Sequence, residues 1–342
     1  MASTPTRATR TARNRPVEIA GTTVAPGRRQ LVELPVARLP TATRLNLPIM
    51  VLNGQRPGPR LWLAAVVHGD ELNGLEIIRR VLEVIRPRRL AGMVLAVPVV
   101  NVFGMVTETR YLPDRRDLNR AFPGSPNGSL AAQLANLFMT NVVAACDMGI
   151  DLHTGSDHRF NLPQIRGDLE DPTTLRLARA FGAPVSVHSP VRDGSLREAC
   201  RRRGIPVVVY EGGEADRFNE TAISAGVAGV LRVLADLEMR IGDPSPPAAA
   251  TTVVRHTHWV RARRAGILRS PVRAGQRVAR GDVLGIIADA VGDSRATMKA
   301  PFDAVVIGHT QHPLVNRGDA LWHLADLDPE AKGTAARPPR AR

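Results

Sequence analysis

The chain has 342 residues, which is enough to bury a sizeable core and to form about two domains. Hydrophobic residues make up 44% and charged residues 23%, as in an ordinary globular protein, and no apolar stretch approaches the ~20 residues of a membrane span. The two cysteines, Cys146 and Cys200, form no CxxC motif. We therefore expect no disulfide framework, no membrane association and a cytoplasmic location.

The net charge of +14 is carried almost entirely by arginine, since Lys299 and Lys332 are the only lysines. Several arginines lie in the terminal segments 1–16 and 329–342, which lack periodic apolar residues and are predicted to be disordered tails. Arginines do not alternate with aromatic residues, which make up only 4% of the chain. The charge therefore does not predict a nucleic-acid partner.

Residues 17–241 are predicted to form an α/β domain in which apolar strands alternate with amphipathic helices. Strands are predicted at residues 47–52, 61–67, 92–100, 148–152, 184–188 and 206–210. Helices are predicted at residues 71–85, 130–145, 173–181, 196–203 and 220–239. This alternation predicts a mixed, mostly parallel sheet that is flanked by helices on both faces.

The composition changes after this domain. Residues 242–252 are rich in proline and alanine and are predicted to be a linker, and residues 253–328 show the short apolar runs and glycine turns of a smaller all-β domain. The segment from Gly275 to Gly285 resembles half of a biotinyl/lipoyl barrel. Lys299, however, directly precedes an Ala-Pro pair, whereas the modified lysine of a carrier lies between two methionines at a hairpin tip. We therefore expect a shared scaffold without the carrier function. The histidines of this domain are predicted to be structural: His256, His258, His309, His312 and His323.

Polar residues follow three of the predicted strands. These segments are His68-Gly-Asp-Glu71, His153-Thr-Gly155 and Glu211-Gly-Gly-Glu214. The carboxyl ends of strands form the ligand crevice of an open α/β sheet, so these side chains can meet although they are remote in sequence. Two histidines and one carboxylate are a common ligand set for a catalytic zinc, whereas a lone histidine at a strand end is usually structural. The spacing alone is equally consistent with structural histidines and with a zinc site of one ion per chain, held by His68, Glu71 and His153, with Glu211 left to handle protons.

Four motifs together resemble the succinylglutamate desuccinylase/aspartoacylase family, whose members are relatives of zinc carboxypeptidases. The segment HGDELNG beginning at His68 resembles the family's HGxExNG, and DLNRAF beginning at Asp117 resembles its DLNRxF. The segment DLH ending at His153 resembles the motif that supplies the third zinc ligand. Glu211 follows a strand where the family places its catalytic glutamate. The resemblance implies a zinc carboxypeptidase-like fold and the same three metal ligands.

The resemblance also implies roles for residues around the metal. Arg110 is expected to polarise the scissile carbonyl, and Glu211 to act as the general base. Asn119 and Arg120 are expected to bind a carboxylate of the substrate, because a planar guanidinium pairs with a carboxylate through two hydrogen bonds.

Three further residues complete the expected site. Asp117 is expected to orient Arg110 or Arg120, and Asp151 to lie behind a metal ligand and orient it. Arg166 is a candidate for a second contact with a substrate carboxylate. Glu214, three residues beyond Glu211, is the alternative base.

The residues and the resemblance together predict a zinc-dependent deacylase that hydrolyses the amide bond of an N-acyl amino acid, or of a similar small carboxylate-bearing amide. One alternative is carboxypeptidase-like cleavage of an acidic peptide tail. Another is a non-catalytic binding module, which is disfavoured because every catalytic position holds a competent side chain. The acyl group, the amino acid, a preference for amide or ester bonds and the formation of a homo-oligomer are left open.

Overall fold

The structure is a computed structural model, and it describes residues 13–240, 246–247, 250–292 and 294–327. The predicted tail at residues 329–342, residues 1–12 of the other tail and most of the predicted linker at 242–252 lie outside the described residues. No helix in the described ranges is long and apolar enough to cross a membrane.

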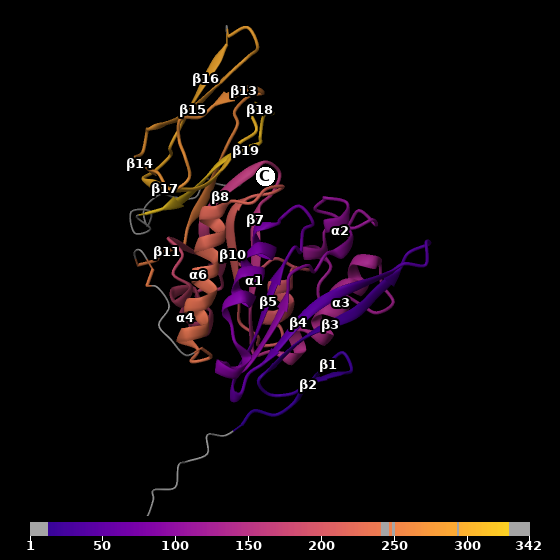
Figure 1. The fold of residues 1–342 in the computed structure, drawn as a ribbon. Coiled ribbons are helices and arrows are strands. Elements are labelled where there is room, and N and C mark those ends of the chain that lie inside the picture. The colour runs from indigo at the N-terminus through magenta and orange to yellow at the C-terminus, as the bar shows by residue number, and fades with distance from the viewer. Residues whose placement is uncertain (1–12, 241–245, 248–249, 293, 328–342) are drawn as a thin grey trace, which may run out of the picture.

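A sheet of thirteen strands forms the centre of the molecule (Figure 1). The strands of this sheet that lie before residue 220 are β3 (Arg28–Arg38), β4 (Arg44–Asn53), β5 (Arg56–Ala65), β6 (Ala91–Val97), β7 (Met148–Gly155), β8 (Arg159–Gly167), β9 (Val185–His188) and β10 (Val207–Glu214). The later strands are β11 (Thr252–Val254), β12 (Thr257–Arg261), β14 (Arg277–Val278), β17 (Ala304–Thr310) and β19 (Ala320–Asp326). The short strands β1 (Val17–Ile19) and β2 (Thr22–Val24) pair with each other in a separate sheet.

The centre of the main sheet is parallel and its flanks are antiparallel. β5 is parallel to both β6 and β7, and β7 is parallel to β10. β4 and β3 extend the sheet antiparallel on one side, and β8 pairs antiparallel with β10 on the other. β6 is buried along its whole length, as expected of a strand that is covered on both faces.

Helices cover both faces of the parallel strands. The helices are α1 (Asn73–Val84), α2 (Val102–Val106), α3 (Leu130–Asn141), α4 (Pro172–Phe181), α5 (Leu196–Arg201) and α6 (Glu220–Asp236), with 3-10 turns at Pro87–Arg89, Leu118–Arg120 and Val143–Ala145. α1 and α4 both pack on α6 on one face (Figure 1). Phe138 of α3 makes an edge contact with Trp62 of β5 on the opposite face, with 5.8 Å between ring centroids. The predicted mixed α/β fold is confirmed.

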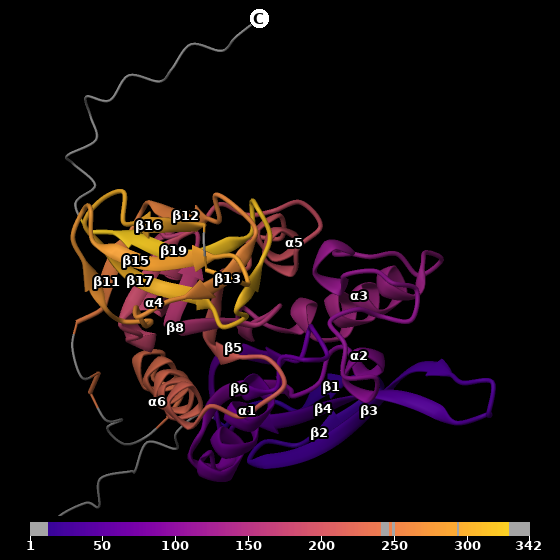
Figure 2. The same cartoon turned by 90° about the horizontal axis from the view of Figure 1, so that it is seen from above.

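The C-terminal strands form a small β unit above the carboxyl ends of the central strands (Figures 1 and 2). A second sheet of four strands, β13 (Gly266–Arg269), β15 (Val283–Ala288), β16 (Arg295–Lys299) and β18 (Leu314–Val315), completes it. The apolar core of the C-terminal unit, centred on Leu284 and Trp322, is separate from the core of the α/β part. Lys299 is exposed at the end of β16, and the absence of a carrier function at this residue stays a prediction.

Hydrogen bonds between strands join the C-terminal unit to the α/β part. β8 pairs with β17 through residues 159–161, and β9 pairs with β11. The sequence did not predict β8 as a strand, and it did not predict that one sheet runs from β3 to β12. The division of the chain into two domains at residues 242–252 stays a prediction.

Candidate active site

A sharp corner brings His68 and Glu71 to the carboxyl end of β5. Val66 has a φ of 53°, which is unusual for a β-branched residue, so the backbone is strained just before His68. Gly69 lies so close to the chain that an added Cβ would be 2.0 Å from the carbonyl carbon of Gly104. Only glycine therefore fits between the two polar side chains.

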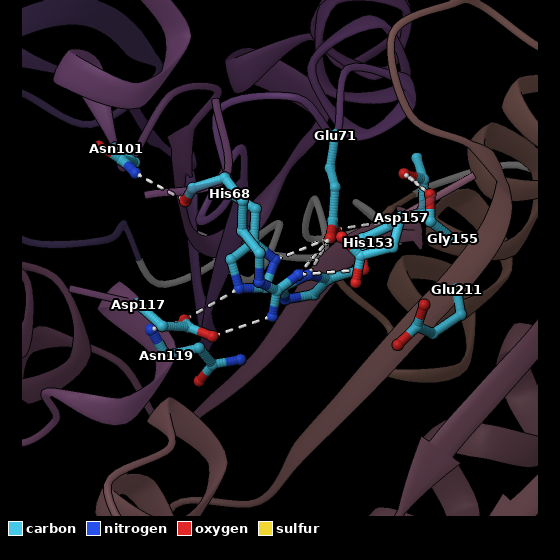
Figure 3. Close-up of polar contacts among 12 residues, drawn as sticks. His68, Glu71, Asn101, Asp117, Asn119, His153, Gly155, Asp157 and Glu211 are labelled. Atoms are coloured by element: carbon cyan, nitrogen blue, oxygen red, sulfur yellow. Dashed lines mark hydrogen bonds and ion pairs between the residues drawn. The ribbon is translucent and has the colours of Figure 1, made fainter. Parts of the chain in front are cut away.

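The carboxylate of Glu71 lies between two imidazole rings (Figure 3). Its Oε1 is 2.7 Å from Nδ1 of His68, and its Oε2 is 2.7 Å from Nδ1 of His153. One ligand atom from each of the three residues lies within 4.8 Å of the others, and all three side chains are buried. The structure thus brings together the three residues that were predicted from two separate strand ends.

The outer ring nitrogen of each histidine contacts a further carboxylate, a different one for each ring. Nε2 of His68 is 3.2 Å from Oδ1 of Asp117, and Nε2 of His153 is 2.9 Å from Oδ2 of Asp151. These contacts fix the ring orientations so that both Nδ1 atoms face Glu71. Two imidazole nitrogens and a carboxylate facing one point match the donor set of a catalytic zinc site, so the residues present fit this metal.

The charges of the cluster are strongly coupled. Burial alone would raise the pKa of Glu71, but His68 and His153 hold it well below its ordinary value. Burial would also lower the pKa of each histidine, but Glu71 with Asp117 raises that of His68, and Asp151 with Glu71 raises that of His153. Glu71 and the two histidines therefore each stabilise the charged form of the other.

Arg110 lies at the edge of this cluster. Its Nη2 donates to Oδ2 of Asp117 at 3.0 Å, and its Nη1 lies 3.4 Å from Oε1 of Glu71 and 3.1 Å from Oγ of Ser156. Asp117 thus contacts Arg110 and His68 together, and its pKa is well below the ordinary value because these cations outweigh its burial. The structure places Asp117 beside Arg110, one of the two arginines considered for it.

Asn119 and Arg120 follow Asp117 in a 3-10 turn. Oδ1 of Asn119 accepts a hydrogen bond of 2.9 Å from the backbone N–H of Leu196 at the start of α5. This bond connects the DLNR segment to α5. Because Oδ1 is used in it, the amide nitrogen of Asn119 is the group that can donate to a ligand. The Arg120 side chain is exposed at the cavity, and its Nη1 donates to the Asn119 carbonyl at 2.5 Å.

Glu211 lies on β10, directly opposite His153 in the register of the parallel strands. Its Oε2 accepts a hydrogen bond of 2.9 Å from Nδ2 of Asn161 on β8. Burial raises the pKa of Glu211, although Arg166 and His153 oppose the shift. In Figure 3 the Glu211 carboxylate lies apart from the ligand cluster, on the His153 side. Glu214 does not line the cavity; it contacts Arg217 at 3.5 Å.

These residues line one cavity of about 550 Å³, a size typical of small-molecule sites. Seven arginines line it: Arg110, Arg120, Arg159, Arg166, Arg192, Arg197 and Arg261. Burial first, and then the neighbouring Arg166, lower the pKa of Arg197 to about 10. The site residues proposed from the sequence line this cavity, except Asp117, which contacts His68 and Arg110 behind it, and the alternative base Glu214.

The C-terminal unit contributes part of the wall. Trp259 and Arg261 of β12 and the turn at residues 318–320 line the cavity together with the α/β part. These residues and Asn161 were not predicted, because they belong to segments that meet only through the β8–β17 pairing. His158, close to the cavity in sequence, stacks on His312 with 5.0 Å between ring centroids and does not line the cavity.

Comparison with known proteins identifies the family. Residues 57–237, more than half of the chain, match the family model of the succinylglutamate desuccinylase/aspartoacylase catalytic domain. The chain therefore belongs to the succinylglutamate desuccinylase/aspartoacylase family, as the four motifs predicted.

Individual relatives resemble the chain over most of its length. It is 26% identical over 294 residues to the N-alpha-acetyl-L-2,4-diaminobutyric acid deacetylase of Halomonas elongata, which covers 82% of this chain and 86% of the relative. The solved succinylglutamate desuccinylase/aspartoacylase of Rhodobacter sphaeroides is 28% identical with a TM-score of 0.79, over 91% of this chain and 99% of that one. The product-bound ectoine utilization protein EutE (DoeB) of Ruegeria pomeroyi has the same TM-score at 22% identity, over 89% and 97% of the two chains, and shows the shared fold.

Proposed function

We propose that this protein is a zinc-dependent deacylase that hydrolyses the amide bond of an N-acyl amino acid. The observation that carries the proposal is the convergence of the two Nδ1 atoms of His68 and His153 on Glu71 at the base of an arginine-lined cavity. The relatives support the reaction class, since the family is named for a desuccinylase and an acylase, and the Halomonas relative is a deacetylase.

His68, Glu71 and His153 would hold the metal. A bound zinc ion supplies a Lewis acid and lowers the pKa of a coordinated water to ~7. Glu211 accepts a proton from the attacking water and returns it to the leaving nitrogen. Asn161 holds Oε2 of Glu211, so Oε1 is the oxygen that takes part in this transfer.

Arginines orient the substrate in this proposal. Arg110, fixed by Asp117, faces the carbonyl oxygen as it gains negative charge, a task for which one donor is typically worth ~3–4 kcal/mol. Arg120 and the amide nitrogen of Asn119 bind the α-carboxylate of the amino acid. Arg166 provides a second carboxylate contact.

The positive cavity wall bears on the substrate's side chain. The Halomonas relative is named for diaminobutyric acid, whose side chain carries an amine. A cationic side chain beside Arg166, Arg192 and Arg197 would meet like charges, whereas an anionic one would be attracted. We therefore propose that the substrate of this protein is an N-acyl amino acid with a neutral or acidic side chain.

A substrate screen tests the proposal. The purified protein, loaded with zinc, is incubated with N-acetyl and N-succinyl amino acids and with free peptides ending in glutamate or aspartate, and the amine released is measured. We expect hydrolysis of an N-acyl amino acid that is lost in Glu211→Gln. Cleavage of the peptides alone would instead assign a carboxypeptidase-like activity, and no hydrolysis of either class would contradict the proposal.

A further inference from the structure

His323 of the C-terminal unit reaches the wall of the candidate active site. It lies on β19 and is only 4% exposed. Its Nδ1 is 3.2 Å from Nη2 of Arg166 on β8. Because an arginine has no acceptor atom, Nδ1 of His323 must accept this hydrogen bond.

The ring of His323 is held in place by a second contact. It stacks on the indole of Trp259 of β12, with 4.4 Å between ring centroids and an angle of 4° between the planes. Trp259 also packs against Arg159, whose guanidinium carbon is 5.5 Å from the ring centroid. Trp259, Arg159 and Arg166 all line the cavity, so His323 supports this wall from behind.

Because Nδ1 accepts a hydrogen bond from Arg166, the imidazole of His323 is neutral. Burial, and then Arg166 and His258, hold its pKa well below the ordinary value. A neutral acceptor orients Arg166 without compensating its charge, whereas an aspartate or glutamate at this position would form an ion pair with it.

Arg166 acts electrostatically on Glu211, whose pKa it acts to lower, but it pairs directly with no carboxylate among the described residues. Among the described residues Arg166 forms no ion pair with an acidic side chain, and its buried Nε atom has no hydrogen-bond partner. Arg166 lines the cavity without an ion-pair partner, so its guanidinium points to an anionic group that binds there.

We propose that His323 is a positioning residue, which holds the Arg166 guanidinium in the orientation that binds an anionic group of the substrate. The proposal deepens the proposed function and rests on it for the identity of the substrate. It also assigns a task to the C-terminal unit: β19 and β12 determine how one arginine of the α/β part is presented to the cavity.

Two variants of His323 separate positioning from packing. His323→Leu keeps a side chain of similar size but removes the acceptor. His323→Asn places an amide oxygen close to the position of Nδ1 and restores the acceptor. Each substitution is also made in the Arg166→Ala background, and melting temperature and bound zinc are measured for every variant as controls of folding.

Binding is read with succinate as the anionic probe, by calorimetric titration of the zinc-loaded protein, so that no turnover is needed. We expect His323→Leu to weaken succinate binding about tenfold or more, as for loss of a hydrogen bond to a charged group, and His323→Asn to recover most of it. In the Arg166→Ala background the two His323 variants should bind succinate alike, because the effect acts through Arg166. With a substrate from the screen, KM should rise more than kcat falls.

The outcomes distinguish this proposal from the proposed function. Equal weakening by leucine and asparagine, or an effect of His323→Leu that persists without Arg166, would show that His323 only packs. A wild-type protein that binds no succinate would also overturn the positioning role. Succinate binding that follows the expected pattern, in a protein that hydrolyses no N-acyl amino acid, would support the role of His323 and refute the deacylase.

Discussion

Asn161 donates a hydrogen bond of 2.9 Å from Nδ2 to Oε2 of Glu211, and so connects β8 to the proposed general base on β10. Behind Asn161 lies Gly308 of β17, where an added Cβ would be 2.7 Å from Oδ1 of Asn161. The side chain that orients Glu211 is therefore fixed between the α/β part and the C-terminal unit.

This relationship predicts the effect of Asn161→Ala. Loss of the donor removes a contact that stabilises the carboxylate, so the pKa of Glu211 should rise further and the acid limb of kcat/KM should move to higher pH. We also expect kcat to fall about tenfold, because the base loses its fixed orientation. A pH–rate profile checks both effects, with the exposed Asn127→Ala as control. An unchanged acid limb would show that Asn161 does not act on Glu211.

A comparison of two further variants separates chemistry from binding. Glu211→Gln keeps the size of the side chain but removes the base, so it should retain zinc and lower kcat by ~10²–10⁴. Arg120→Ala should mainly raise KM through the lost carboxylate contact, with a smaller fall in kcat. Steady-state kinetics and elemental analysis measure both. Loss of zinc in Glu211→Gln would make Glu211 a ligand, and near-normal kcat would place the base elsewhere.

Zinc binding should release protons and weaken as the pH falls. His68 and His153 have pKa values raised above 6.5 in the metal-free protein, whereas zinc binds neutral imidazole. Protons therefore compete with the metal already above pH 6.5, and affinity should rise with pH. Calorimetry in buffers of different ionisation enthalpy measures the protons released, and elemental analysis should give about one zinc per chain.

Controls for the metal site come from other histidines. The double variant His68→Ala with His153→Ala should bind no zinc at this site, whereas the exposed His312→Ala should bind it normally. Full metal content in the double variant would refute the assignment.

Asp151 should act on the metal only through His153. Asp151→Asn removes the charge that holds Nε2 of His153, so zinc affinity should fall about 10–100-fold while the ligands themselves remain. Competition with a chelator of known affinity measures the change. Asp193→Asn, at an aspartate that is 97% exposed, is the matched control. Equal affinity in both variants would show that the His153–Asp151 contact does not tune the site.

The ligand cluster could be predicted because its residues lie next to strong local signals. His68 follows one apolar strand and His153 lies near the carboxyl end of another, and parallel strands bring their carboxyl ends to the same edge. The sequence pattern therefore placed residues 85 positions apart into one site.

β8 was missed because its sequence, RFNLPQIRG, lacks an apolar run and contains a proline. Asn161 lies on this strand, and its link to Glu211 went unnoticed for that reason. The pairing of β8 with β17 joins segments about 150 residues apart, and no local pattern encodes such a contact. His323, predicted to be structural, could be connected to Arg166 only through that pairing.

The position of β8 in the sheet affects whether the C-terminal unit can be removed from the α/β part or unfold separately from it. One edge of β8 is bonded to β10, and the other is shared by β9 and β17. Cutting the chain after α6 would leave part of that second edge as an open row of amide and carbonyl groups, which invites association with other chains. The C-terminal unit is thus no removable module: it closes an edge that the α/β part cannot leave open, and melting either one would disturb the other.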